Sequence, residues 1–225
     1  MNLLQGKVVV LTGSTSGIGE AAALQLAAIG ARLVLVARDP QRAEATLKRL
    51  KPGVKHTAHI ADLSLIAETK RVAQEIAAAE PRIDVLINNA GVMSAERQLT
   101  ADGLELTFAT NHLAYFILTQ SLLTRLLAAA PARIINTASE VHRGAHLDFS
   151  DLQSEKRYSS YGVYGKSKLA NVLFTRELAL RLAGTGVTVN LSPPRRCSQP
   201  FRTTSQRKRG RSVLCQLSGQ PRHRS

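Results

Sequence analysis

The sequence contains no tryptophan, and aromatic residues make up only 4% of its 225 positions. Two cysteines are too few for a disulfide scaffold, and no Cys/His spacing indicates a zinc site. No run approaches the roughly 20 apolar residues that a membrane-spanning helix needs. Residues 1–6 lack the basic and apolar regions of a signal peptide. We therefore predict no bound metal, no membrane span and a cytoplasmic location.

Acidic residues are absent from the end of the chain. Residues 191–225 hold nine Lys or Arg and no Asp or Glu, so they supply +9 of the net charge of +14. This segment is rich in Arg, Ser, Pro and Gln and has little apolar periodicity, so we predict a disordered tail. An RNA-binding arm is the alternative, but the basic run 207–211 has no aromatic partner for base stacking. A nucleic-acid partner is therefore not the expectation.

Short apolar runs alternate with helical patterns through residues 1–190. Runs rich in β-branched residues predict strands at 7–11, 32–36, 54–60, 83–87, 133–137 and 187–191. Helices are predicted at 17–29, 41–50, 64–79 (with Ser64 as N-cap), 102–129 and 159–183. Six such alternations with short connections require a parallel sheet with right-handed crossovers. The predicted fold class is a doubly wound, Rossmann-like α/β sheet.

A glycine-rich loop joins the first strand to the first helix and reads TGSTSGIG over residues 12–19. Glycine is needed where a turn takes positive φ and where backbone must approach a pyrophosphate. The helix that follows directs free N–H groups and its positive dipole end toward phosphates. The loop predicts a dinucleotide site, although by itself it is also compatible with a turn that binds nothing.

The residues after the second and third strands bear on the choice of cofactor. Arg38 follows the second strand, where an arginine can pair with a 2′-phosphate, and this favours NADP over NAD. Asp39 is the reservation, because a carboxylate there can accept from ribose hydroxyls, but it can also cap the next helix. Asp62 follows the third strand, where it can either accept from the adenine amino group or cap a helix.

The fourth strand runs into Asn88-Asn89-Ala90-Gly91. Residues at the carboxyl end of a parallel strand face the crevice in which doubly wound folds bind their ligands. Amide side chains there can lock the loops around a cofactor, and the small residues Ala90 and Gly91 leave room for its rings.

The pair Tyr164 and Lys168 is spaced i to i+4 on a predicted helix, so the two side chains share a face. A phenol with a pKa of about 10 is a poor base at neutral pH. A neighbouring ammonium favours the phenolate, so we expect Lys168 to lower the pKa of Tyr164. Ser139, at the end of the fifth strand, is expected to donate to a substrate carbonyl oxygen. Alone, the pair would indicate no more than an exposed helix surface.

Together these motifs resemble the short-chain dehydrogenase/reductase family over about residues 5–190. The run KSKLANVLF at 166–174 resembles the retinol dehydrogenase and WW-domain oxidoreductase branch. The resemblance implies one dinucleotide-binding domain over residues 1–190 and a helix kinked at an asparagine. The residues assigned to the cofactor are Gly13, Ser16, Gly17, Ile18, Gly19, Arg38, Asp62, Asn88, Ala90, Gly91, Tyr164 and Lys168. The implied catalytic tetrad is Asn111, Ser139, Tyr164 and Lys168.

The resemblance ends after Asn190. In the family the sixth strand leads to a Pro-Gly turn, a substrate lid and a final strand, whereas here the chain continues Leu-Ser-Pro-Pro-Arg. We predict that the lid and the last strand are missing from this sequence. The family often pairs through the helices that hold Asn111 and Tyr164, so a homodimer is a hypothesis.

Three functions remain open from the sequence. The first is an NADP-dependent enzyme, with NAD as the alternative cofactor, that moves a hydride between nicotinamide and a small carbonyl or alcohol substrate. The second is a truncated, inactive relative that retains weak dinucleotide binding. The third is a nucleotide- or RNA-binding adaptor without chemistry.

Overall fold

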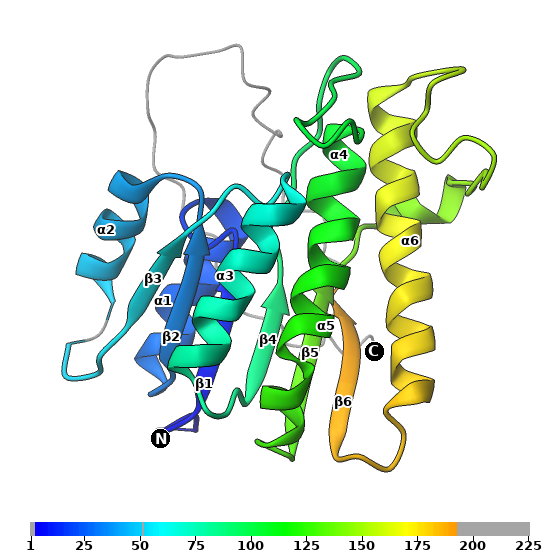
Figure 1. Cartoon of the computed structure of the whole chain (residues 1–225). Coiled ribbons are helices and arrows are strands. Elements are labelled where there is room, and N and C mark those ends of the chain that lie inside the picture. Colours follow the sequence, from blue (N-terminus) through cyan, green and yellow to red (C-terminus); the bar gives the residue numbers. More distant parts are fainter. Residues whose placement is uncertain (1–2, 51, 193–225) are drawn as a thin grey trace, which may run out of the picture.

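Six parallel strands form one sheet in the order β3-β2-β1-β4-β5-β6 (Figure 1). The computed structural model describes residues 3–50 and 52–192. The strands are β1 (Val8–Thr12), β2 (Arg32–Ala37), β3 (Thr57–Ile60), β4 (Val85–Asn88), β5 (Ala132–Thr137) and β6 (Val187–Ser192). The order reverses between β1 and β4, which is the switch point where doubly wound folds bind ligands. The predicted fold class is confirmed.

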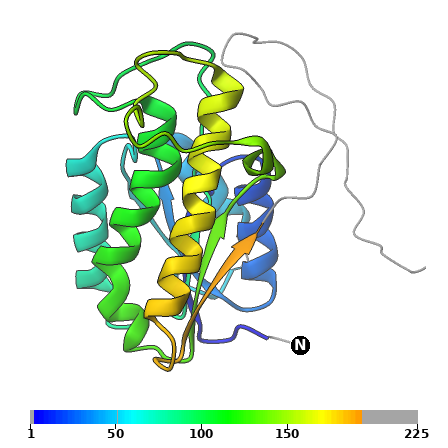
Figure 2. The same cartoon turned by 90° about the vertical axis from the view of Figure 1, so that its right-hand side faces the viewer.

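Helices cover both faces of the sheet (Figure 2). They are α1 (Gly17–Ala28), α2 (Pro40–Arg49), α3 (Ile66–Ala79), α4 (Leu106–Phe108), α5 (Ala114–Leu127) and α6 (Ser160–Arg181). One apolar core joins the sheet to α3, α5 and α6, and a second joins it to α1. Because β1 lies between these cores, Val9, Val10 and Leu11 are all fully buried. This burial on both faces explains the continuous apolar run in the sequence.

The long helix predicted at 102–129 is broken and begins later. It consists of α4, a π-helical turn at Ala109–Leu113 and α5. The start is set by the buried carboxylate of Glu105, which accepts from the backbone N–H groups of Thr107 (2.9 Å) and Phe108 (2.7 Å). The segment 99–105 is not helical: it folds back on itself, and Leu99 pairs with Glu105 in an antiparallel bridge.

The predicted N-cap of the third helix is also wrong. Helix α3 begins after Leu65, and its first amide, that of Ile66, donates to the Asp102 carboxylate at 2.7 Å. The cap therefore comes from a loop 36 residues away, and it satisfies an amide that Ser64 was expected to serve.

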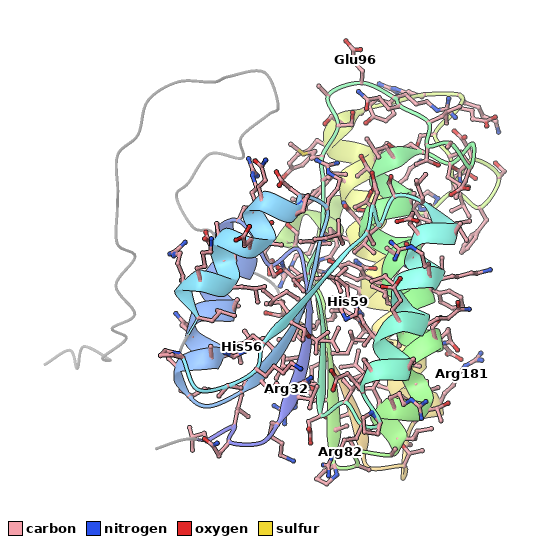
Figure 3. All side chains as sticks on the ribbon, turned by 60° about the vertical axis from the view of Figure 1, so that its left-hand side comes forward. Arg32, His56, His59, Arg82, Glu96 and Arg181 are labelled. Atoms are coloured by element: carbon pink, nitrogen blue, oxygen red, sulfur yellow. The ribbon has the colours of Figure 1, made fainter. Side chains whose placement is uncertain are left out.

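The strands begin at the end of the molecule where Arg82 lies and finish at the end where Glu96 lies (Figure 3). Leu191 pairs with Asn136, as the strand predicted at 187–191 requires, and Ser192, predicted to lie in the tail, continues β6 by pairing with Thr137. The rest of the predicted tail, residues 193–225, lies outside the described residues, and so the prediction that the lid and the last strand are missing stays a prediction.

Candidate active site

The glycine loop is locked to the loop that follows β4. The Thr12 hydroxyl accepts from the backbone N–H groups of Asn89 (2.9 Å) and Ala90 (3.0 Å). In return the Asn89 amide donates to the carbonyl oxygens of Thr12 (3.1 Å) and Gly13 (3.3 Å). The amide lock predicted for this loop is therefore made by Asn89.

Glycine is required in this loop for two physical reasons. A Cβ on Gly19 would stand 2.0 Å from the Gly13 carbonyl oxygen, and one on Gly13 would stand 2.7 Å from the Ala90 Cα. Gly13 and Gly17 also adopt φ of +64° and +54°. Beyond Gly17 the space is open, since a Cβ there would meet no atom within 4 Å.

The first turn of α1 presents groups that suit an anion. The N-cap residue Ser16 makes no side-chain hydrogen bond to this turn. The Ser14 hydroxyl is buried and has no hydrogen-bond partner in the part of the chain that the structure describes. A buried polar atom without a partner is costly, so it marks a place where a ligand group can bind. These features fit the phosphates of a dinucleotide.

Arg38 is exposed and directly follows β2. The neighbouring Asp39 caps α2, because its carboxylate accepts from the N–H groups of Gln41 (2.9 Å) and Arg42 (3.1 Å). The capping role considered for Asp39 is thus confirmed. Asp62 uses one carboxylate oxygen to accept from the Ser64 N–H at 2.9 Å, and its contact with adenine stays a prediction.

The side chain of Asn88 makes hydrogen bonds inside the fold. The residue is fully buried, and its amide donates to the Thr119 hydroxyl (3.0 Å) and to the Asn136 side-chain oxygen (2.9 Å). Asn88 therefore ties β4 to α5 and β5. Its Oδ1 is buried and has no hydrogen-bond partner among the described residues, and the assignment of Asn88 to the cofactor stays a prediction.

Tyr164 and Lys168 share one face of α6, as their spacing predicts, and both are nearly buried at 8% and 2% exposure. The Lys168 ammonium donates to the Thr137 carbonyl oxygen at 3.0 Å. It also lies 5.6 Å from the ring centroid of Tyr164 and 5.5 Å from that of Tyr115. These contacts partly compensate a charge that has been removed from water.

Burial governs the ionisation of both groups. Burial lowers the pKa of Lys168 to about 8. Burial raises the pKa of Tyr164, and a hydrogen bond from the Ser139 hydroxyl opposes this rise without reversing it. The net shift of the pKa of Tyr164 is therefore upward, not downward as expected from the neighbouring Lys168, because desolvation outweighs the favourable interactions. Tyr164 is consequently protonated at neutral pH.

Asn111 lies within the π-helical turn, so the implied helix distortion is found at the asparagine. Its side chain accepts from the Val92 N–H (2.7 Å) and donates to the Val92 carbonyl oxygen (2.9 Å) and to the Ser167 hydroxyl (3.1 Å). A Cβ on Gly91 would stand 3.3 Å from the Asn111 oxygen and 3.7 Å from the Lys168 nitrogen. Gly91 thus lets the β4 loop pass close to both residues.

Sequence reasoning missed Tyr115. This residue is fully buried, its hydroxyl donates to the Ala90 carbonyl oxygen at 2.8 Å, and its ring lies beside the Lys168 ammonium. Burial raises its pKa far above the usual value for tyrosine, so its hydroxyl stays a donor. The available signal was its position four residues after Asn111, which places both side chains on one side of the distorted helix.

A recess of about 540 Å³ lies between the end of α6 and β6, and none of its lining residues belongs to the tetrad.

Within residues 3–50 and 52–192 there is no cluster of three or more His, Cys, Asp or Glu placed to hold a metal ion. Among the helices described, none combines the length and apolar character needed to cross a membrane.

The fold belongs to the doubly wound α/β class, and the glycine loop and the Tyr164–Lys168 pair are features expected of a dinucleotide-dependent member of that class. A family model described as short chain dehydrogenase matches residues 7–210, and the chain belongs to that family.

Its relatives include two human proteins and a bacterial structure. Human retinol dehydrogenase 12 is 43% identical over 217 residues, covering 95% of this chain and 67% of the relative. Human retinol dehydrogenase 14 is 41% identical over 208 residues, covering 85% and 62%. The Pseudomonas aeruginosa RhlG/NADP active-site complex has a TM-score of 0.70 at 31% identity, covering 84% of this chain and 72% of that one. The chain spans about two thirds or less of the human relatives it matches.

Proposed function

We propose that this chain is an NADP-dependent oxidoreductase that interconverts a carbonyl compound and its alcohol. The observation that carries the proposal is the buried phenol of Tyr164, which is hydrogen-bonded to Ser139 and lies one helical turn from Lys168. Family membership and the similarity to two human retinol dehydrogenases support the same reaction class.

NADP is the proposed cofactor, and its nicotinamide would supply or accept the hydride. Gly13, Ser16, Gly17, Ile18 and Gly19 would hold the phosphates. Arg38 would pair with the 2′-phosphate: it is exposed and has no ion-pair partner within the described residues, while Asp39 is occupied in capping. Asp62 would hold the adenine, and Ala90 and Gly91 would lie beside the nicotinamide. Similarity to a structure solved with NADP is further support.

The protonated state of Tyr164 favours carbonyl reduction at neutral pH. As the substrate carbonyl gains negative charge on its oxygen, the phenol donates its proton to that oxygen. The Ser139 hydroxyl is placed to donate a hydrogen bond to the same atom. The phenolate that remains is stabilised by the Lys168 ammonium, which is mostly charged at pH 7 because its pKa is about 8. In the oxidative direction Tyr164 would take the proton back.

The substrate class follows from the relatives more than from the site. The human relatives are named for retinol, so retinal and simpler aldehydes and ketones are the proposed test substrates.

A second candidate function is dinucleotide binding without turnover. One observation favours it: after Asn190 the chain continues Leu-Ser-Pro-Pro-Arg, where the family resemblance implies a Pro-Gly turn. Such a protein would keep the glycine loop and lose the pocket that positions a substrate.

One experiment separates the two candidates. The purified chain is titrated with NADPH and with NADH by fluorescence, and NADPH oxidation is then followed with the carbonyl panel. The proposed enzyme binds NADPH more tightly than NADH and oxidises it with at least one carbonyl. Binding without oxidation of any member supports the second candidate, and absence of binding contradicts both.

A further inference from the structure

Helix α6 carries a buried polar stripe below its catalytic tyrosine. Its members lie on one side of the helix and are at most 8% exposed. They are Tyr164, Ser167, Lys168, Asn171 and Thr175. A helix face packed against a core is ordinarily apolar, and buried polar groups are retained only when they are hydrogen-bonded. These five side chains therefore need hydrogen-bond partners, and most of the partners lie on other helices, strands and loops.

Asn171 is fully buried and uses both ends of its amide on two successive residues of the π-helical turn. Its Nδ2 donates to the backbone carbonyl oxygen of Asn111 at 2.8 Å. Its Oδ1 pairs with Nδ1 of His112 at 2.9 Å. Because the oxygen can only accept, this geometry requires His112 to carry its proton on Nδ1.

His112 is held on its other sides by aromatic rings. Its ring centroid lies 5.2 Å from that of Phe108, on its own helix, and 6.2 Å from that of Phe174, on α6. Burial lowers the pKa of His112, so the ring is neutral and a single tautomer is fixed by its partner. The Asn111 carbonyl oxygen can only accept, so it faces the Nδ2 end of the Asn171 amide, and the Nδ1–H group of His112 holds the Oδ1 end in place.

The same turn positions the tetrad. The Asn111 side chain is bonded to the Val92 backbone and to the Ser167 hydroxyl, while its carbonyl oxygen is bonded to Asn171. Asn171 lies one turn beyond Lys168 on α6. Asn111 is therefore attached to α6 at two points, on either side of Lys168 in sequence. A π-helical turn is a local departure from regular helix geometry, and it persists where surrounding contacts specify it.

We propose that Asn171, oriented by His112, is a positioning residue that fixes the π-helical turn and hence the placement of Asn111 relative to Lys168. The catalytic part of this inference rests on the proposed function, whereas the structural part does not. The pair acts through Asn111 and touches neither cofactor nor substrate in the proposed reaction.

Two substitutions of Asn171 test the hydrogen bonds made by the two ends of its amide. Asn171→Asp keeps an acceptor for His112 and removes the donor to Asn111, and Asn171→Leu removes both at similar volume. Asp84→Asn is the matched control, because it removes buried hydrogen bonds near Arg82, at the end of the molecule where the strands begin (Figure 3). All three are expected to lose stability, so stability alone does not decide.

Turnover and backbone hydrogen exchange distinguish a positioning role of Asn171 from a general loss of stability. Both Asn171 variants should lower kcat by about 10- to 100-fold, since small misplacements cost this much, with the KM for NADPH changed less than about threefold. Backbone amides of residues 109–113 should exchange faster in both variants and stay as in the unmodified chain in Asp84→Asn. If Asn171→Leu matches Asp84→Asn in kcat and in exchange at 109–113, the proposal is overturned.

The unmodified chain provides a test that needs neither turnover nor a folded variant. Nitrogen NMR of the imidazoles should find His112 neutral near pH 7 with its proton on Nδ1. A proton on Nε2 would exclude the bond to Asn171 Oδ1 and overturn the proposal. If the chain turns over no carbonyl, the proposed function fails, and the tautomer and the exchange data still decide whether Asn171 fixes the turn.

Discussion

At the scale of single residues, the site is defined by polar groups that the fold has removed from water. Lys168 is 2% exposed, and its compensation consists of one carbonyl oxygen and two aromatic rings. No carboxylate is among these contacts. A buried cation with such partners costs stability, and proteins retain such groups where function requires them.

Replacing Lys168 by methionine is expected to stabilise the protein. The pKa of Lys168 falls from 10.5 to about 8 on folding, so below pH 8 the folded state carries a penalty of about 3 kcal/mol. Between pH 8 and 10.5 the unfolded chain holds more protons, and the stability of the unmodified chain rises with pH. Urea denaturation should find Lys168→Met more stable by about 2–3 kcal/mol at pH 7.5, with a smaller difference at pH 9.5. A less stable variant at pH 7.5 would contradict this account.

The sequence identified the residues of the site whose spacing is local and missed those whose partners are distant. Tyr164 and Lys168 are four residues apart, and the glycine loop is continuous, so both are readable as patterns. Asn171 and Asn111 are bonded across 60 positions, and nothing local to either one reveals the other. The raised pKa of Tyr164 was missed for the same reason, because its cause is burial by elements remote in the chain.

At the scale of elements, strands were more predictable than helix starts. The buried apolar runs located each of the strands that the structure describes, but β3 is shorter than predicted and covers Thr57–Ile60. Just before it, the His56 ring accepts from the Leu33 N–H at 3.0 Å, replacing a backbone partner with a side chain (Figure 3). The start of α3 depends on Asp102 and the start of α4 on Glu105, and neither contact belongs to a helical repeat.

The Glu105 cap provides a test at this scale. Its two carboxylate oxygens accept from two buried amides, and glutamine keeps one oxygen and places a donor against the other amide. Glu105→Gln should therefore lower the free energy of unfolding by about 1–3 kcal/mol. Thermal and urea denaturation measure the loss, and Glu177→Gln, an exposed pair with Arg181, should change stability by less than about 1 kcal/mol. If the two substitutions lowered stability equally, the claim that the Glu105 carboxylate stabilises the start of α4 would be contradicted.

At the scale of the whole molecule, one end of the sheet carries the proposed site and the other end carries hydrogen bonds that stabilise the fold. The end where the strands finish carries the loops of the site. The end where they begin carries Asp84, which accepts from the Lys7 ammonium (2.8 Å), the Val8 N–H (2.9 Å) and the Arg82 guanidinium (3.0 Å). The bonds of Asp84 tie β1 to β4 at the centre of the sheet, and so they support the switch point from the opposite end.

Asp84 should make stability fall in acid. Burial acts to raise the pKa of Asp84, but the hydrogen bonds from Lys7, Val8 and Arg82 together lower it. Its contribution is therefore complete above the unfolded pKa near 4 and is lost as the pH falls through the lower folded value. The stability difference between the unmodified chain and Asp84→Asn should shrink below about pH 4. A difference that is constant from pH 7 to pH 3 would contradict this role.

The basic balance of the chain comes mainly from residues 193–225, which lie outside the described residues. The family match extends to residue 210, past the end of the predicted domain at 190, so the boundary between domain and tail remains a prediction. The residues that carry the proposed chemistry all lie within the part of the chain that the structure describes.

The central claim is that the Tyr164 phenol is the proton donor to the substrate oxygen. Its direct test is NADPH oxidation by the chain and by Tyr164→Phe, with a carbonyl that the unmodified chain reduces and with NADPH affinity measured in parallel. The account predicts that kcat falls by at least about 100-fold in the variant, while NADPH binding changes by less than a few-fold. Turnover by Tyr164→Phe at the rate of the unmodified chain would contradict it.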